Sequence, residues 1–572
     1  MTRPGDGSAE PANPRSPRTD FRGPARRIKP ALLALLALGF LWRVARYAAC
    51  PPLWGDEAFI AVNLLGRDYA GMLRTLDYYQ IVPLGFLWSE LAVVRTLGGS
   101  EWAIRLIPFL AGLLSLGLFG RFAARAVDRR TALLAVGVFA ASFYPVRHAT
   151  EVKPYSTDLL LGLAATTLAW SLRRDLSASR KWVALTLTIG LGVWFSYPLV
   201  FVAVGLGLFL AGLVLKDHRP RALVAFGLFG ALTAMSWLSS YLAFARPQSQ
   251  AAPFYSKLET WRGAFPPLAR PWELPGWLID VHTGNMLAYP HGGNNFASTL
   301  TAGLVLIGAV RLWRSRRDLV VLLLSPLPPM LLASCFHVYP YGTSARTTLF
   351  MAPAFCLLAS VGAMALIRRF RSSMKRERAV RLTAIGLGLI PLVGSVGNVV
   401  QPYKNWEDTL NRRAVESLAR MAWPGDRWLV TDGLDLSLES RKSILEHWVQ
   451  QVAEVKYNIL ADAPVPTRWL PNPVEVESAA SSGHTWLIVH RTGCRNFDYA
   501  GIEAEKGKLE ARLGAPEVLE FKLTRGESIT AYHFAGPGSP PMGESWATRY
   551  DGTTRPASTS APGAPDAPTV RK

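Results

Sequence analysis

The sequence predicts a mainly α-helical, polytopic membrane protein of about eleven transmembrane helices with a small external α/β domain at its C-terminus. Hydrophobic residues make up 50% of the 572 residues and charged residues only 18%, against roughly 25% charged residues in soluble globular proteins. Apolar runs long enough to cross a bilayer recur along the chain, and arginine clusters separate alternate runs. This composition excludes a disordered protein, and the four cysteines are too few for a small disulfide scaffold.

The N-terminus combines a polar tail with the first apolar run. Residues 1–27 are rich in Pro, Gly, Ser and Arg and cannot form a core, so we expect a disordered cytoplasmic tail. Residues 28–50 follow as the first transmembrane helix. A basic start before an apolar run also resembles a signal peptide, but Arg43 and Arg46 near its end and the many later apolar runs favour a helix that is retained.

The positive-inside rule selects among the arrangements of the apolar runs. The range 81–98 carries Glu90 and Arg95 and either crosses the membrane or lies in its interface. If it does not cross, every arginine cluster falls on the side of the N-terminal tail. This arrangement predicts a cytoplasmic N-terminus and an external C-terminus in the cell membrane (inner or plasma membrane). The further candidate helices are 102–122, 131–148, 155–172, 182–198, 199–215, 221–243, 297–312, 319–336, 346–367 and 381–400.

We expect four parts in the chain. After the tail 1–27, the transmembrane domain covers 28–400, and its long external loops, 51–101 and 244–296, are rich in Trp, Tyr and Pro, which favours a functional role over disorder. Alternating strand-like and helix-like patterns predict an external, periplasmic α/β domain over 402–535. The Pro-, Ser- and Ala-rich end, 536–572, is predicted to be disordered. The predicted strands are 427–431, 485–490, 517–523 and 528–534, and the predicted helices are 410–422, 444–455 and 500–513.

Two adjacent carboxylates, Asp56 and Glu57, follow the first predicted transmembrane helix. Charged groups at a membrane are costly unless they are solvated or used. An acid at this place can act as a general base on an acceptor hydroxyl, or it can bind a cation. The alternative is a solvated helix cap, because what looks like an amphipathic helix follows the pair through Leu65.

Several basic residues lie on the same predicted external side as these acids. Arg105 is at the outer end of a helix, where it can hold a phosphate or anchor the helix to lipid headgroups. The cluster of Arg147, His148 and Lys153 runs against the orientation rule and therefore fits a specific anion. The alternative is an ion pair with Glu151, which lies within the cluster.

The remaining candidates lie in two other external segments. Tyr341 and Arg346 precede a late helix, which Arg346 opens. In the second long loop, His282 and His291 stand near a Gly-Gly-Asn-Asn sequence that suits a polar ligand, although a plain loop also explains it. No His/Cys spacing resembles a zinc site, and neither a P-loop nor a G-x-G-x-x-G motif occurs. We therefore expect no cofactor. The acid pair is the one feature that could bind a divalent cation.

An acid and several cations on one side of the membrane suit a particular kind of substrate. Its phosphate would lie at headgroup level and its apolar tail in lipid, as in a polyprenyl-phosphate sugar. The phosphate would leave, the cations would stabilise its charge, and the acid would deprotonate the acceptor hydroxyl. The net charge of +21 does not indicate a nucleic-acid partner, because much of the basic excess lies in predicted cytoplasmic loops, where it sets orientation.

The order of several short motifs points to a known family. The motifs are Gly55-Asp56-Glu57-Ala58, Val82-Pro83-Leu84, Arg105-Leu106-Ile107-Pro108 and Glu151-Val152-Lys153-Pro154-Tyr155. Their order resembles the GT-C glycosyltransferases, and more closely family 39, with the protein O-mannosyltransferases, the lipid A aminoarabinose transferase and their bacterial relatives. The resemblance covers roughly 28–400 and implies a GT-C fold, a cytoplasmic N-terminus and a donor bound as a polyprenyl-phosphate sugar.

The resemblance also implies roles for individual residues. Asp56 matches the acid that the family uses as catalytic base, and Arg105 matches an arginine near the donor phosphate. The motif ending in Tyr155 is usually written with Arg where this chain has Lys153, and the family's His-Pro-Pro-Leu is here Ile81-Val82-Pro83-Leu84. We predict Asp56 and Glu57 as catalytic residues, Arg105, Arg147, Lys153 and Arg346 as donor-phosphate ligands, Tyr155, His148, Tyr341 and His291 as substrate-binding residues, and no metal ligand.

The sequence thus predicts an inverting membrane glycosyltransferase with an acidic general base. It would move a sugar from the polyprenyl-phosphate donor to a lipid, glycan or protein acceptor on the external face, with membrane lipids as neighbours. The alternative is a transporter or flippase of lipid-linked glycans, which internal repeats and midplane charges would favour. We find no such repeat, and the charges of interest lie at outer helix ends. A third possibility is a membrane anchor that displays the α/β domain.

Overall fold

The computed structural model describes most of the helical part of the chain and pieces of the C-terminal part. The predicted tail 1–27 and the predicted helix 444–455 lie outside the described residues. The described residues are 28–76, 80–251, 263–290, 297–370, 372–400, 410, 413–414, 417–418, 421, 427–431, 467–469, 484–491, 499–522, 528–535 and 569–571.

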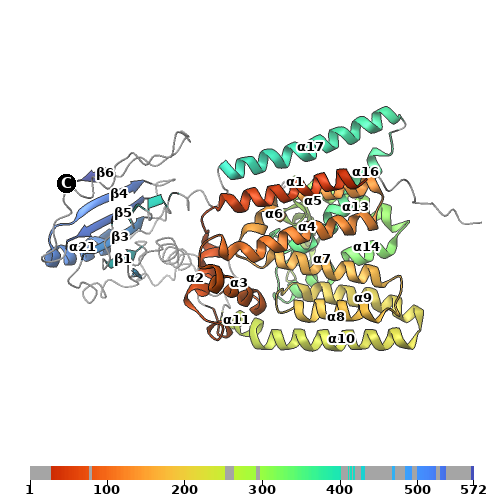
Figure 1. Ribbon diagram of the computed structural model, residues 1–572, viewed down its shortest axis with the longest axis horizontal. Helices are drawn as coiled ribbons and strands as arrows, with labels where there is room; N and C mark the ends of the chain where they lie inside the picture. Colours follow the sequence, from red (N-terminus) through yellow and green to blue (C-terminus); the bar gives the residue numbers. More distant parts are fainter. Residues whose placement is uncertain are drawn as a thin grey trace, which may run out of the picture.

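The larger part of the protein is a bundle of long helices that lie side by side (Figure 1). Links as short as 127–128 and 218–219 make the helices on either side of them antiparallel. The helices are α1 (Ile28–Ala49), α2 (Gly55–Gly66), α3 (Leu84–Leu97), α4 (Leu106–Ala126), α5 (Arg129–Ala141), α6 (Phe143–Arg147), α7 (Tyr155–Leu172), α8 (Ser179–Gly192), α9 (Leu199–Asp217), α10 (Pro220–Ser240), α11 (Arg246–Ala251), α12 (Leu274–Thr283), α13 (Ala297–Trp313), α14 (Arg317–Leu324), α15 (Leu327–Cys335), α16 (Ala352–Ile367) and α17 (Ser373–Val400). Shorter helical turns lie at Gly71–Leu73, Ala103–Arg105, His148–Thr150, Tyr241–Ala245, Pro271–Glu273, Asn285–Leu287 and Leu349–Met351.

These helices make the chain a multi-pass membrane protein. In the described part of the chain, six helices are long and apolar enough to span a bilayer, or up to seven if one bent pair counts as a single span. Every range that the sequence predicts to cross the membrane contains a helix or a broken pair of helices. The mainly helical fold is therefore confirmed, and the number of eleven crossings stays a prediction.

The uncertain range 81–98 forms α3, which has 14 residues. At about 1.5 Å of rise per residue, such a helix reaches only about two thirds of the hydrocarbon thickness. It packs mainly against α2 and the turns Gly71–Leu73 and Ala103–Arg105, and it also contacts α4. This geometry agrees with the arrangement in which the range does not cross the membrane.

Two of the predicted membrane-spanning ranges contain a break, and a proline lies next to each break. The range 131–148 divides at Ser142 into α5 and a short second segment, bent by 54°. Pro145 has no N–H for the carbonyl one turn earlier, so the α5 helix cannot continue through it. The range 319–336 divides in the same way between α14 and α15, next to Pro326. Both ranges still contain a candidate membrane span, the first as a bent pair of helices and the second as Arg317–Cys335.

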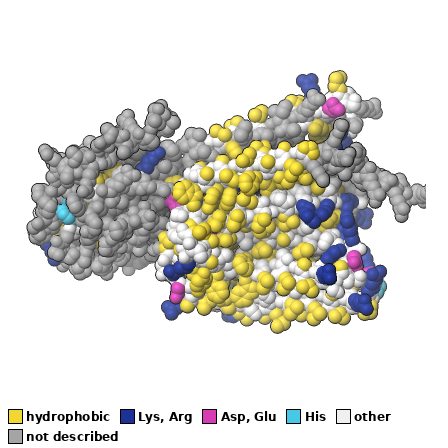
Figure 2. Space-filling model, in the orientation of Figure 1, with side chains coloured by type: hydrophobic (Ala, Val, Ile, Leu, Met, Phe, Trp, Pro, Cys, Tyr) yellow, Lys and Arg dark blue, Asp and Glu magenta, His cyan; other side chains and the backbone are white. Residues whose placement is uncertain are grey.

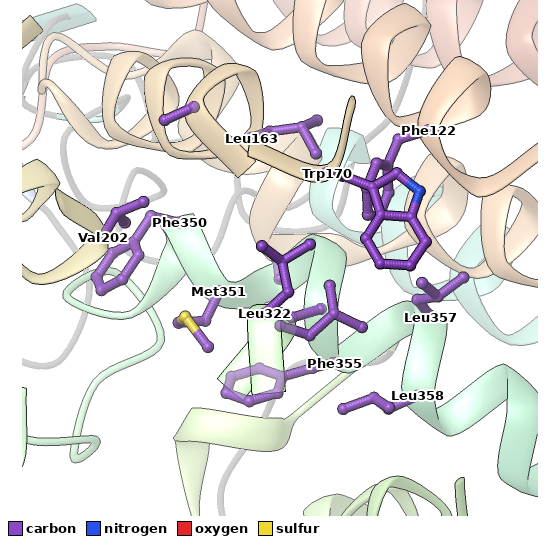
Figure 3. Packing of buried hydrophobic residues seen from close by; sticks show 14 of the residues in the cluster. Phe122, Leu163, Trp170, Val202, Leu322, Phe350, Met351, Phe355, Leu357 and Leu358 are labelled. Atoms are coloured by element: carbon purple, nitrogen blue, oxygen red, sulfur yellow. The ribbon is translucent and has the colours of Figure 1, made fainter. Parts of the chain in front are cut away.

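The core lies where α4, α7, α9, α14 and α16 converge (Figure 3). Helix α16 is apolar on nearly every side and is accordingly buried along most of its length. Side chains from the facing helices close around it, among them Phe122, Trp170 and Leu322, each less than 5% exposed. A separate cluster that includes Phe59, Phe86, Ile104 and Val152 packs α2, the helix that carries Asp56 and Glu57.

Helices α13 and α16 approach so closely that only glycine fits at their crossing. A Cβ at Gly308 would collide with the backbone oxygen of Leu358, and a Cβ at Gly362 would collide with that of Leu304. Small residues permit such close packing between membrane helices. The two glycines therefore set the distance between the helices.

We expect Gly308→Ala to destabilise the protein by about 1–3 kcal/mol, because the two backbones would have to separate. Thermal unfolding in detergent micelles would show this as a lower apparent melting temperature. Gly303→Ala is the matched control on the same helix, since a Cβ there meets no atom within 4 Å. Equal melting temperatures for the two variants would contradict the role assigned to the crossing.

Charge is unevenly spread over the helical bundle. Figure 2 shows Lys and Arg side chains gathered at the end of the bundle opposite α2 and α3, and a wide hydrophobic surface between the ends. Exposed Arg125 near the end of α4, and Arg129 and Arg130 at the start of α5, flank the link between the two helices. The distribution is the one that the positive-inside rule describes for a membrane protein.

The C-terminal part contains a six-stranded mixed sheet beyond the α2 end of the bundle (Figure 1). The strand β1 pairs in parallel with β2 and β3, whereas β5 pairs antiparallel with β3 and β4. The segment 569–571, within the predicted tail 536–572, forms β6 on the edge next to β4. The strands are β1 (Arg427–Thr431), β2 (Thr467–Trp469), β3 (Thr485–Arg491), β4 (Glu517–Lys522), β5 (Ser528–Phe534) and β6 (Thr569–Arg571), and the helix is α21 (Tyr499–Leu513).

Candidate functional site

The candidate site is centred on Asp56, in the first turn of α2. The backbone N–H of Trp54 donates to the Glu57 carboxylate at 3.3 Å, which closes this turn. The Asp56 carboxylate has a different partner: Arg346 donates from Nη1 to its Oδ2 at 2.5 Å. Both side chains of this ion pair are 17% exposed. Asp56 is therefore both charged and accessible, as a reacting group must be.

Lys153 and Tyr155 lie beside the Asp56–Arg346 pair. Lys153 Nζ donates to Gln80 Oε1 at 2.9 Å. Burial lowers the pKa of Lys153, and the charge of Asp56 acts in the opposite direction. Tyr155, at the start of α7, interacts electrostatically with Arg346 and Asp56. The structure thus brings together residues from four separate segments of the chain.

The Glu57 carboxylate has partners other than those of Asp56, and it is buried and hydrogen-bonded. It receives two hydrogen bonds from Arg105, from Nε and Nη2, each at 2.9 Å. The backbone N–H of Val152 donates to the same carboxylate at 2.9 Å. Both charged side chains of this pair are no more than 2% exposed. The pair therefore fastens α2 to the segments that carry Arg105 and Lys153, and the geometry favours a positioning role for both residues.

We expect Glu57→Gln to destabilise the protein by about 3–5 kcal/mol, because it leaves the buried Arg105 guanidinium without a counter-charge. Thermal unfolding in micelles would measure the loss, and the double variant with Arg105→Gln should lose less than the two single variants together. Glu273→Gln is the control, since Glu273 belongs to an exposed ion pair with Arg270. A Glu57 variant as stable as this control would contradict the assignment.

A second buried charge cluster lies next to the first. Arg147 Nε donates to Glu151 Oε1 at 2.5 Å, and His148 Nδ1 lies 2.6 Å from Glu151 Oε2. Although burial opposes it, the charge of Arg147 together with His148 holds the pKa of Glu151 well below its usual range. Arg46 of α1 adds a hydrogen bond from Nε to Thr150 Oγ1 at 2.9 Å. The predicted ion-pair alternative for Arg147 is thus what the structure shows.

Tyr341 lies in the segment before α16 but faces another set of neighbours. Its hydroxyl is 3.2 Å from His282 Nε2, and its ring packs against Trp277. Burial raises the pKa of Tyr341 to about 12. Tyr144, whose ring stacks on that of His148, donates to Asn285 Oδ1 at 3.2 Å. Asn285 Nδ2 in turn donates to the backbone oxygen of Thr343, two residues after Tyr341, which links the two regions indirectly. His291 lies outside the described residues.

The structure therefore groups the predicted residues in a way that the sequence alone did not show. Asp56, Arg346, Lys153 and Tyr155 lie together, with the Asp56–Arg346 pair partly exposed and Lys153 buried. Arg105, Arg147 and Glu57 are in buried ion pairs. Sequence reasoning missed Gln80, the partner of Lys153, because a single amide in a loop has no distinguishing pattern. Arg46 was noticed only as a charge near a helix end, with no signal that it would bond Thr150.

The acid pair does not form a joint cation site. The Asp56 carboxylate faces Arg346, whereas the Glu57 carboxylate faces Arg105, so each already has its own positive partner. Among the residues that the structure describes, no group of three or more His, Cys, Asp and Glu side chains could hold a metal ion. The donor set here is suited to binding an anion rather than a metal.

Comparison with known proteins supports this reading of the fold. Residues 82–239 match the family described as dolichyl-phosphate-mannose-protein mannosyltransferase. No curated protein matches the chain in sequence.

Two crystal structures of ArnT from Cupriavidus metallidurans share the fold. The apo structure superposes with a TM-score of 0.52 at 12% identity, covering 88% of this chain and 97% of ArnT. The structure bound to undecaprenyl phosphate has a TM-score of 0.53, with the same identity and coverage. The chain therefore shares the fold of ArnT, and residues 82–239 match the mannosyltransferase family; in these two respects it is similar to the GT-C glycosyltransferases, as the motif order predicts.

Proposed function

We propose that the protein transfers a sugar from a polyprenyl-phosphate carrier to an acceptor hydroxyl, with Asp56 as the general base. The observation that carries the proposal is the contact between Asp56 and Arg346, two residues 290 positions apart that meet in an accessible place. Lys153 stands beside them. A base next to two cations is what this transfer requires, since one partner loses a proton while the other develops negative charge.

In the proposed reaction the acid accepts a proton and the cations stabilise negative charge. Asp56 takes the proton of the acceptor hydroxyl as its oxygen attacks the anomeric carbon of the sugar. The bond from that carbon to the phosphate oxygen breaks, and the polyprenyl phosphate leaves with the bonding electrons. Arg346 and Lys153 stabilise the charge on the leaving phosphate. Attack opposite to the leaving group inverts the configuration at the anomeric carbon.

The resting ion pair has a consequence for the order of binding. Without substrate, Arg346 neutralises Asp56 and keeps it from acting as a base. A donor phosphate competes for the same guanidinium, which can bind phosphate through two parallel hydrogen bonds. Donor binding would therefore release Asp56, so we propose that the donor binds before the acceptor.

The proposal also includes the orientation and the lipid character of the donor. ArnT from Cupriavidus metallidurans, which shares the fold, has been crystallised with undecaprenyl phosphate. The site lies at the bundle end opposite the Lys- and Arg-rich end (Figure 2). With the basic end in the cytoplasm, the site and the C-terminal sheet face outward. We propose a lipid, glycan or protein as acceptor on that face.

Mass spectrometry of cell-surface glycans and lipids, with and without the protein, tests the proposal directly. The expected result is one sugar that is missing in the absence of the protein and restored by the wild-type chain. Unchanged surface glycans and lipids would contradict it. Labelled sugar that crosses sealed vesicles without forming a new glycosidic bond would indicate transport instead.

A further inference from the structure

His148 has one ring nitrogen in use and one without a partner. Its Nδ1 lies 2.6 Å from Glu151 Oε2, whereas its Nε2 is buried and makes no hydrogen bond. The residue is only 4% exposed. Buried polar atoms are nearly always paired, because leaving one unpaired costs its desolvation. An orphaned atom of this kind indicates a group that arrives with a ligand.

The contact with Glu151 determines what the free nitrogen can do. An ionised carboxylate only accepts hydrogen bonds, so the proton of the contact belongs to Nδ1. Glu151 is already paired with Arg147, and a second positive charge on the buried ring would lie near Arg147 and Arg346. The ring is therefore neutral, and Nε2 carries a lone pair. It can accept a hydrogen bond and cannot donate one.

The surroundings of the ring place the free nitrogen next to the site. The ring of Tyr155, which interacts with Asp56 and Arg346, is 5.1 Å from the ring of His148 in an edge-on arrangement. On another side, the ring of Tyr144 stacks at 6.0 Å. Because Nδ1 faces Glu151, Nε2 is on the side of the ring turned away from it. His148 is thus held by a carboxylate and two aromatic rings.

We propose that His148 recognises the donor sugar, by accepting a hydrogen bond at Nε2 from one of its hydroxyl groups. This inference rests on the proposed function and names the part of the donor that the residue contacts. A donor phosphate diester offers only acceptor oxygens, which a lone pair would repel, whereas a sugar offers hydroxyl donors. Glu151 and Arg147 act through His148 as positioning residues, because they fix its tautomer and orientation.

The experiment measures binding rather than turnover, so that the acceptor need not be known. Purified protein in lipid nanodiscs is titrated with undecaprenyl phosphate and with undecaprenyl-phosphate hexoses and pentoses. The quantity of interest is the ratio of the affinity for the best sugar-bearing lipid to the affinity for undecaprenyl phosphate alone. Monodeoxy forms of that sugar then show which hydroxyl group contributes.

Two variants separate the proposed contact from a structural role. His148→Phe keeps the flat ring between Tyr144 and Tyr155 but loses both nitrogens. His148→Asn keeps an N–H for Glu151 but lacks the acceptor at the place of Nε2. We expect both variants to lower the affinity ratio by about 3- to 10-fold, the size of one neutral hydrogen bond. In both variants, one monodeoxy donor should bind as well as the full sugar.

The outcomes distinguish this inference from the proposed function. If wild-type protein binds neither undecaprenyl phosphate nor its glycosides, the proposed function is contradicted, and so is the inference that rests on it. If undecaprenyl phosphate binds but either variant keeps the full affinity ratio, the role of Nε2 is overturned while the phosphate site stands. A wild-type protein that binds every monodeoxy donor as well as the full sugar would overturn it equally.

Discussion

Asp56→Asn is expected to abolish sugar transfer while the protein still folds and still binds its donor. The amide cannot take a proton from the acceptor hydroxyl, and loss of a general base lowers turnover by about 10²- to 10⁴-fold. The fold should persist, because the side chain is partly exposed and asparagine keeps an oxygen for Arg346. Turnover can be followed once the mass-spectrometric comparison has identified the sugar and the acceptor.

Donor binding by this variant gives a second and more distinctive readout. The wild-type carboxylate both occupies Arg346 and repels an approaching phosphate. Asp56→Asn should therefore bind undecaprenyl phosphate more tightly than the wild type, in spite of its lost activity. Asp280→Asn is the control, because Asp280 is an exposed carboxylate on α12. Near-normal transfer by Asp56→Asn would remove Asp56 from the role of base.

Arg346→Ala is expected to lose both donor binding and transfer. Hydrogen bonds to charged groups contribute about 1.5–3 kcal/mol, so the affinity for undecaprenyl phosphate should fall by about 10- to 100-fold. Arg346→Lys should fall between the wild type and Ala, because lysine keeps the charge but loses the planar fork of donors. Titration of each variant in nanodiscs with undecaprenyl phosphate measures these differences.

The two variants thus have opposite effects on binding and the same effect on turnover. This combination is specific to an arginine that exchanges a carboxylate for a phosphate. Arg270→Ala is the matched control, since the Arg270 side chain is 64% exposed and pairs with Glu273. An Arg346→Ala protein that binds undecaprenyl phosphate like the wild type would exclude Arg346 from the phosphate site.

Much of the fold was predictable because a membrane helix can be recognised from the apolar content of its own segment. The range 155–172 coincides with α7, whose start follows Pro154 and whose end precedes two arginines. The strands at the edges of the sheet were harder to predict from the sequence. The strands β2 and β6 have three residues each and were missed, since so short a segment carries no period. The same holds for the breaks in 131–148 and 319–336, where apolar content concealed the effect of proline.

The site was predictable as a set of residues but not as an arrangement. The sequence marked Asp56 and Glu57 as one acid pair, because they are adjacent in the chain. In the structure they face different partners, Arg346 and Arg105. Adjacent residues on a helix are rotated by about 100° from each other, so neighbours in sequence rarely share a task. Asp56 is partly exposed, as the proposed base must be, whereas Glu57 is buried and holds Arg105.

The sequence by itself determined that this chain is a helical membrane protein, and its motif order pointed to the superfamily. Length, hydropathy and charge suffice for that, because each transmembrane helix satisfies its own backbone hydrogen bonds and needs no distant partner. Only the tertiary structure decided that Asp56 meets Arg346, that Glu57 holds Arg105, and that one nitrogen of His148 is left free. These contacts depend on how segments far apart in the chain pack together, and no local pattern encodes that packing.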